Sequence, residues 1–243
     1  ANASTFVYDG AAWNDLSGHD KTVPSTGIIL SETAPNTTIT DDDYTLAGAV
    51  ELDVSTVTIT DDSWTATATT GAPAGRAAHT AVWTGSEMII WGGTNASRLN
   101  TGGRYDPATD SWTATTTTGA PAARFQHTTL WTGTEMIIWG GNVGSVTNTG
   151  GNYDHATDSW TATTTTGAAS ARLRHEVAWT GTEMLVWGGF NGFGGIGTGA
   201  RYDPAADSWT PMTNTNAPSA RIPDKIIWTG TEGIIWGGNG GPG

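Results

Sequence analysis

The sequence predicts an all-β fold made of small sheets that repeat along the chain. The motif Glu-Met-Ile-Ile-Trp-Gly-Gly occupies residues 87–93 and returns unchanged at 135–141, and related copies occupy 183–189 and 232–238. The Trp residues of these copies are 48, 48 and 49 residues apart. Short extended runs and Gly-containing turns surround each copy. A fixed period of this size is typical of a repeat architecture.

The repeat at residues 76–119 shows how one unit is built. Residues 76–83 form an extended run, and the Gly of the following Thr-Gly-Ser turn can take the positive φ that a hairpin needs. Residues 87–91 are a buried second strand that ends at the double Gly. A short third strand at 102–105 and an Asp-Pro-Ala-Thr turn lead to a fourth strand that begins at Asp110. Four strands joined in this way make an antiparallel sheet, and radial repetition of such sheets makes a β-propeller.

The motif spacing predicts three complete repeats and one half repeat. The complete repeats are residues 71–119, 120–167 and 168–216. Residues 217–243 contain only the first two strands of a further sheet. A ring leaves strand edges open unless its last sheet is completed.

The first residues of the chain provide a candidate for the missing half. Residues 6–13 read Phe-Val-Tyr-Asp-Gly-Ala-Ala-Trp and resemble the third and fourth strands of a repeat with two residues deleted from the turn. Residues 1–17 are therefore expected to pair with residues 224–238 and close the ring. The whole chain, 1–243, is then one domain.

Two interpretations of the number of sheets remain open. Residues 18–70 span about one period and contain strand-like runs, but they have no double Gly; they are expected to form a degenerate sheet, which gives five blades. In the alternative, residues 52–69 complete the last repeat. That ring has four blades, and residues 1–50 form an arm.

The repeats resemble the kelch family. The double Gly at residues 92–93 is followed by Tyr105 after 12 residues and by Trp112 after 7 more, and Arg-x-x-His precedes each first strand in three copies. The resemblance implies a propeller that acts as a binding or scaffolding module, and it covers residues 62–238 strongly. Its implied structural residues are Gly92, Gly93, Gly140, Gly141, Gly188, Gly189, Gly237, Gly238, Trp112, Trp160 and Trp209.

Composition excludes several classes of function. The net charge of −13 disfavours nucleic acid and anionic membranes as partners, and no apolar run reaches the roughly 18 residues that span a bilayer. The absence of Cys excludes disulfides and thiolate sites, and with them the copper-radical enzymes among kelch proteins. No nucleophile–base set is visible. We therefore expect no cofactor, no metal and no catalytic residue, hence no enzyme.

Most of the recurring side chains are expected to be structural. The Trp residues at 91, 139, 187 and 236 end buried strands and are expected in the core. The His residues at 79, 127 and 175 are interpreted as hydrogen-bonded supports between sheets, with a metal-binding ring as the alternative. The Arg residues at 76, 124, 172 and 221 are expected to tie neighbouring sheets together through carbonyls or carboxylates.

The loops after each double Gly differ freely between the repeats. A fixed scaffold with variable loops is how repeat folds present binding sites. These loops predict a partner-binding surface that contains Asn95, Arg98, Asn100, Asn142, Asn148, Phe190, Asn191 and Phe193.

The sequence favours an extracellular, non-catalytic module that binds a protein or a glycan through these loops. A composition low in Lys and rich in Thr, Gly and Asn, and a start without Met, predict a secreted or cell-surface protein. The alternative is a structural subunit of a surface layer, sheath or filament. Such a subunit would self-associate by strand exchange or edge contacts.

Overall fold

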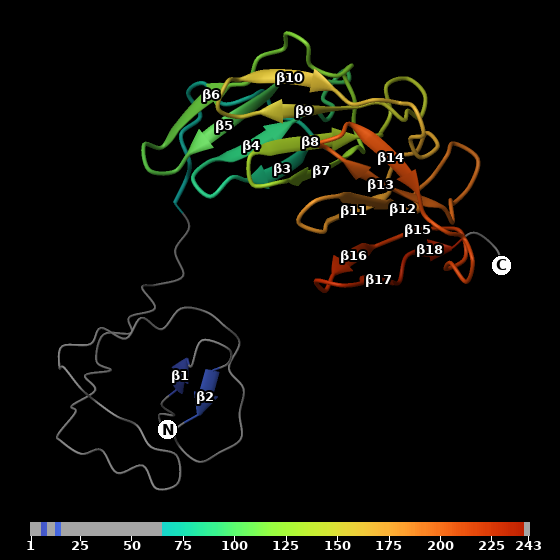
Figure 1. Ribbon diagram of the computed structural model, residues 1–243. Helices are drawn as coiled ribbons and strands as arrows, with labels where there is room; N and C mark the ends of the chain where they lie inside the picture. Colours follow the sequence, from blue (N-terminus) through green and yellow to red (C-terminus); the bar gives the residue numbers. More distant parts are fainter. Residues whose placement is uncertain (1–5, 9–12, 16–64, 241–243) are drawn as a thin grey trace, which may run out of the picture. The chain divides into compact units, whose positions relative to one another are not determined.

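The computed structural model describes residues 6–8, 13–15 and 65–240 (Figure 1). The chain divides into two compact units, residues 1–65 and 66–243. The described part of the first unit is an antiparallel pair of strands, β1 (Phe6–Tyr8) and β2 (Trp13–Asp15), with Tyr8 opposite Trp13. These are the two short strands predicted there. The degenerate sheet expected at 18–70 lies almost entirely outside the described residues, as does the arm of the alternative.

The second unit contains three complete four-stranded sheets, and in each the strands follow chain order. We call them blades 1, 2 and 3. Blade 1 consists of β3 (Thr80–Trp83), β4 (Met88–Trp91), β5 (Gly102–Asp106) and β6 (Ser111–Ala114). Blade 2 consists of β7 (Thr128–Trp131), β8 (Glu135–Trp139), β9 (Gly150–Asp154) and β10 (Ser159–Ala162). Blade 3 consists of β11 (Glu176–Trp179), β12 (Met184–Trp187), β13 (Gly199–Asp203) and β14 (Ser208–Pro211).

The last repeat forms only half a blade in the described residues. β16 (Lys225–Trp228) pairs with β17 (Gly233–Trp236), and the short β15 (Arg221–Ile222) pairs with β18 (Asn239–Gly240). The first strands β3, β7, β11 and β16 lie next to one another in this order, so each blade packs on its chain neighbour (Figure 1). The predicted all-β propeller architecture is thus confirmed. The number of blades and the closure of the ring stay predictions.

Aromatic side chains fill the space between blades. Trp91 and Trp139 are fully buried, and each packs on the fourth-strand Trp of the following blade, with ring centroids 5.3 Å apart for Trp91–Trp160 and 5.1 Å for Trp139–Trp209. The fourth-strand Trp also donates its indole N–H to a carbonyl of the preceding blade, as Trp160 does to Thr116 at 3.1 Å. Trp therefore both packs and hydrogen-bonds across the boundary between blades 1 and 2 and that between blades 2 and 3.

The double Gly is required by the close approach of the next blade. Gly92 and Gly140 have φ of 67° and 69°, a region that disfavours a side chain. A Cβ on Gly92 would lie 2.7 Å from Cε1 of His127, and one on Gly140 would lie 2.6 Å from Cε1 of His175. There is thus no room for a side chain at these two glycines of the blade boundary.

The recurring Arg side chains hydrogen-bond within their own repeat and do not join neighbouring blades as predicted. The Arg124 guanidinium donates to the carbonyls of Ala122, Gly140 and Thr149, at 2.9, 3.0 and 2.6 Å, and all three belong to its own repeat. It is the Arg124 main chain that reaches the preceding blade, where its carbonyl accepts from Gly93 N–H at 2.8 Å. The side chain thus ties the first strand to the second and third strands of one blade, and the prediction of a side-chain tie between blades is wrong.

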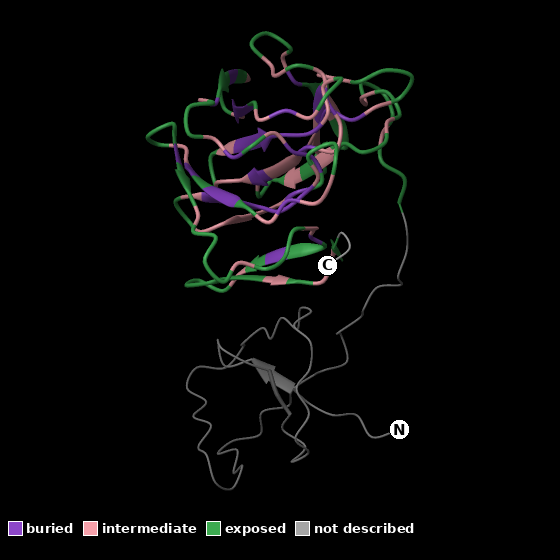
Figure 2. Cartoon of the chain, turned by 90° about the vertical axis from the view of Figure 1, so that its right-hand side faces the viewer, coloured by how far each residue is buried: buried purple, intermediate pink, exposed green. Residues whose placement is uncertain are grey.

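Burial falls towards the half blade, where exposed residues predominate (Figure 2). Trp236 has the same sequence context as Trp91 and Trp139, yet it is 86% exposed. The core position expected for Trp236 is not realised in the described unit, because no further sheet of that unit covers it.

Candidate functional site

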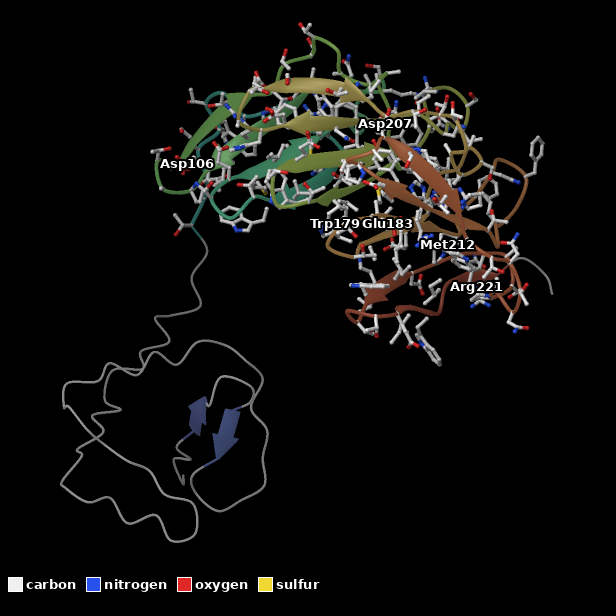
Figure 3. The ribbon with its side chains drawn as sticks, viewed as in Figure 1. Asp106, Trp179, Glu183, Asp207, Met212 and Arg221 are labelled. Atoms are coloured by element: carbon white, nitrogen blue, oxygen red, sulfur yellow. The ribbon has the colours of Figure 1, made fainter. Side chains whose placement is uncertain are left out.

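The antiparallel register gives the second unit two distinct ends. The first end, which we call the loop end, contains the double Gly motifs, the variable loops after them and the segments that enter each first strand. Its parts are joined by bridges such as Ala77–Thr94, Phe125–Asn142 and Leu173–Phe190. The opposite end, the turn end, contains the tight turns between strands one and two and between strands three and four. Figure 3 shows both ends on one strand, with Asp207 at the start of β14 and Met212 beyond its far end.

Charge is separated between these two ends. Residues 1–64 contain 11 acidic residues and 1 basic residue, whereas residues 65–243 contain 12 acidic and 9 basic residues. Ten of the latter acids lie in the turn-end turns or beside them: Glu87, Asp106, Asp110, Glu135, Asp154, Asp158, Glu183, Asp203, Asp207 and Glu232. Seven of the nine basic residues belong to the loop end: Arg76, Arg98, Arg124, Arg172, Arg174, Arg221 and Lys225.

The loop end is therefore electropositive although the chain is acidic. Its two acidic residues are already engaged: Glu176 pairs with Lys225 at 3.2 Å, and the Asp224 carboxylate accepts from Gly238 N–H at 2.9 Å. The two basic residues outside the loop end, Arg104 and Arg201, lie on third strands and contact turn-end groups. An acidic ligand is thus attracted to one end of this unit and repelled by the other.

A depression of about 340 Å³ lies where the first strands of the blades begin at the loop end. Its lining includes the equivalent residues Ala78, Gln126 and Arg174, followed in the last repeat by Pro223. The first three have φ of 52°, 56° and 53°, a left-handed conformation that is uncommon outside glycine. Strained positions of this kind gather at ligand sites, because the surrounding structure has to hold them in place.

Arg174 is the exposed charge in this depression. With the Gln126 amide oriented to satisfy its partners, its oxygen accepts from Nη2 and Nε of Arg174 at 2.7 and 2.8 Å. This contact orients the guanidinium and leaves its other N–H groups free to donate to a ligand.

Three of the Asn residues predicted to bind a partner also accept hydrogen bonds from the loop backbone. The side-chain oxygen of Asn95 accepts from Ala96 N–H, that of Asn142 from Gly144 N–H, and that of Asn191 from Phe193 N–H, at 2.7 to 2.9 Å. These are Asx-type turns, which shape a loop. Asn100 and Asn148 are half-buried at the ends of their loops.

Arg98 and Phe193 are the most available of the predicted contact residues. Arg98 is exposed and donates through Nε to the Asn142 oxygen at 3.3 Å, which links the loops of blades 1 and 2. Phe193 is 98% exposed at the tip of a Gly-rich loop, while Phe190 is half-buried and bridges Leu173 and Gly195. The prediction had missed Arg174 and Gln126. They vary inside the otherwise fixed Arg-x-x-His motif, and this variation is the feature of the sequence that could have marked them as candidate binding residues.

The buried His residues have a structural role. Nε2 of His127 is hydrogen-bonded to the Thr80 hydroxyl of the preceding blade at 2.8 Å, and His175 makes the same contact with Thr128 at 2.6 Å. Burial, with a further contribution from Arg124, lowers the pKa of His127 to about 3. Burial also holds the pKa of His175 well below its ordinary value. Both rings are neutral at physiological pH, as expected of supports between blades.

Within the described residues, no group of three or more His, Asp or Glu side chains is arranged to hold a metal ion. These residues also contain no helix that is long and apolar enough to cross a membrane.

Comparison with known families agrees with this architecture. The family model described as the KLHDC2/KLHL20/DRC7 Kelch-repeats domain matches residues 42–240. No curated protein gave a significant match. Kelch domains mediate protein interactions and are generally non-catalytic scaffolds, which agrees with the structural role of the double Gly, Trp, Arg and His residues. The chain belongs to the kelch-repeat family.

Proposed function

We propose that this protein is a non-catalytic binding module whose loop end recognises an acidic surface or segment of a partner protein. Membership of the kelch family supports protein binding in general. The observation that supports this particular partner is the separation of charge, which concentrates basic residues at the loop end of an acidic chain. Complementary charge raises the association rate and excludes partners of the wrong sign.

The loop end provides three kinds of contact to such a partner. Arg174 in the depression and Arg98 on the rim present guanidinium groups, which bind carboxylates with bidentate geometry. Phe193 offers an exposed aromatic ring, a residue type that is enriched at interfaces. The sequence also predicts that the protein lies outside the cell, and the proposal includes this location. A glycan is the alternative ligand.

A random peptide library selected on the full chain tests the proposal. We expect the enriched peptides to be rich in Asp and Glu and their affinity to fall steeply with added salt. The double variant Arg98→Glu/Arg174→Glu is expected to weaken binding by at least about 30-fold, since removing one partner of a charge pair buried in an interface costs about 2–5 kcal/mol and each 1.4 kcal/mol is about tenfold. Arg201→Glu, a charge reversal at the turn end, is the matched control and should leave the affinity nearly unchanged.

Two results would contradict the proposal. Enrichment of neutral or basic peptides would refute the charge argument. Equal losses in the loop-end and turn-end variants would place the site elsewhere. A glycan array with specific binders, together with an unenriched peptide library, would establish the glycan alternative instead.

A further inference from the structure

The variable loop of blade 3 contains an Asn that is followed directly by Gly. The sequence Asn-Gly occurs twice in the chain, at Asn191–Gly192 in this loop and at Asn239–Gly240 in β18. In the other two loops, Asn95 and Asn142 are followed by Ala and Val. The following residue matters because its backbone nitrogen can attack the side-chain amide of the Asn, and a side chain on that residue obstructs the approach.

Nothing in the structure obstructs this attack at Gly192. A Cβ placed on Gly192 would have no atom within 4 Å, so the space around this backbone is open. Its φ of 98° is a conformation that glycine adopts without strain. Asn191, Gly192 and Phe193 are all exposed, so water reaches the amide and the backbone has room to rotate.

Two backbone donors hold the oxygen of the Asn191 amide. Its Oδ1 accepts from the N–H groups of Phe193 and Gly194, both at 2.9 Å. Negative charge develops on this oxygen when a nitrogen adds to Cγ, and fixed N–H donors stabilise such an oxyanion. Neither donor is the Gly192 nitrogen, the group that attacks. At Asn95, by contrast, the donor at 2.7 Å is the N–H of the next residue itself.

We propose that Asn191 is a site of spontaneous deamidation. The Gly192 nitrogen forms a bond to Cγ of Asn191, the bond from Cγ to Nδ2 breaks, and the proton of the Gly192 N–H leaves with the amide nitrogen as ammonia. The product is a cyclic imide. Water then opens the imide at either carbonyl and leaves an aspartate or an isoaspartate at position 191.

The reaction places a carboxylate in a loop that has no charged residue between positions 190 and 198. This loop belongs to the loop end, where Arg98 and Arg174 are proposed to bind an acidic partner. The new charge lowers the affinity for such a partner, a consequence that rests on the proposed function. Asn191→Asp is accordingly expected to weaken the binding of acidic peptides by about two- to fivefold.

Peptide mapping by mass spectrometry tests the deamidation itself. The full chain is incubated in mildly alkaline buffer, folded in one sample and unfolded in urea in another, and conversion at Asn191 and Asn239 is followed with time. Asn239 and Gly240 are also exposed, but they pair with Ile222 and Arg221, which holds their backbone extended. We expect Asn191 to react at least about tenfold faster than Asn239 in the folded protein, and both to react at similar rates in urea.

Two variants of the loop locate the cause. Gly192→Ala adds a methyl group beside the attacking nitrogen and is expected to slow the reaction at Asn191 by at least about tenfold. Gly194→Ala is the matched control, because a Cβ there also meets no atom within 4 Å and the N–H that donates to Asn191 is kept. Its rate should be nearly unchanged. Circular dichroism checks that both variants fold like the parent.

Other outcomes overturn the proposal. Equal rates at Asn191 and Asn239 in the folded protein would show that the loop does not single out Asn191. A much slower reaction at Asn191 in the folded protein than in urea would show that the loop protects the amide. Both results are read from the parent chain by mass and without a partner, so they are independent of the variants and of the proposed function.

Discussion

Two buried His residues at the blade boundaries stabilise the fold only while their rings are neutral. His127 and His175 are buried, and each is hydrogen-bonded to a Thr of the preceding blade. Because burial lowers their pKa values, the folded protein keeps both rings neutral while the unfolded chain protonates them near pH 6.5. The stability they contribute is complete above pH 6.5 and is lost as pH falls towards the folded pKa.

The free energy of unfolding is therefore expected to decrease between pH 7 and pH 5. Each buried His contributes a limiting slope of about 1.4 kcal/mol per pH unit below 6.5. Urea unfolding at several pH values measures this slope, which should be shallower in His127→Gln. His79→Gln, a change at the equivalent exposed position of blade 1, is the control. A slope unchanged in His127→Gln would show that His127 does not carry this linkage.

Blades 2 and 3 are each held together by one buried guanidinium, that of Arg124 and that of Arg172. Arg124 is 1% exposed, and burial lowers its pKa only to about 10, so that it stays charged and saturates carbonyls of three parts of its blade. Arg221 makes fewer contacts, to Gly237 and Ser219, in the incomplete blade. The Arg side chain is thus more buried and makes more hydrogen bonds in a complete blade than in the half blade.

Arg124→Lys is expected to destabilise the protein much more than Arg221→Lys. A Lys ammonium cannot reach the same set of acceptors, and buried carbonyls left unpaired cost about 1–3 kcal/mol each. We expect a loss of about 2–4 kcal/mol for Arg124→Lys and less than about 1 kcal/mol for Arg221→Lys. Chemical denaturation measures both values. Equal losses would contradict the idea that the complete blade buries the ion.

Within the second unit, acidic residues gather at the turn end. Burial raises the pKa of Glu135, and repulsion from Asp154 adds to the rise. An acid whose pKa is raised on folding destabilises the protein once it ionises, so this contribution worsens as pH rises above about 4.5. The charge separation that suits the loop end for a ligand therefore has a cost in stability at the other end.

Added salt is expected to stabilise the protein at pH 7. Screening at about 0.3 M reduces repulsion among the turn-end acids, and a rise in Tm of about 2–5 °C is expected relative to about 10 mM salt. Glu135→Gln should raise Tm at low salt and weaken this dependence. Glu183→Gln breaks the ion pair with Arg201 and serves as the opposing control. Differential scanning calorimetry reads all three, and a Tm that falls with salt would contradict the repulsion argument.

Some features of the fold could be predicted from the sequence because they are local. The strand–turn–strand pattern of residues 76–119 depends on Gly, Pro and Asp at turns, and the double Gly marks places where a side chain has no room. These signals recur with a fixed period, so a strand or turn that is unclear in one repeat can be assigned from the other repeats. The hydrogen bonds of Asn95 and Asn142 to the loop backbone depend on the loop conformation, which the sequence pattern does not specify.

The repeat, the order of strands within a blade and the variable loops can all be recognised in the sequence. Which copies are buried and which charged side chains meet depends on how the blades pack. Trp139 and Trp236 have nearly the same neighbours in sequence, yet one is fully buried and the other is 86% exposed, because burial depends on whether another sheet packs against that face. Arg174 likewise gained its importance from Gln126 of the preceding repeat, 48 residues away. Local chemistry fixes the blade, whereas contacts between blades are non-local and cannot be deduced from any one copy.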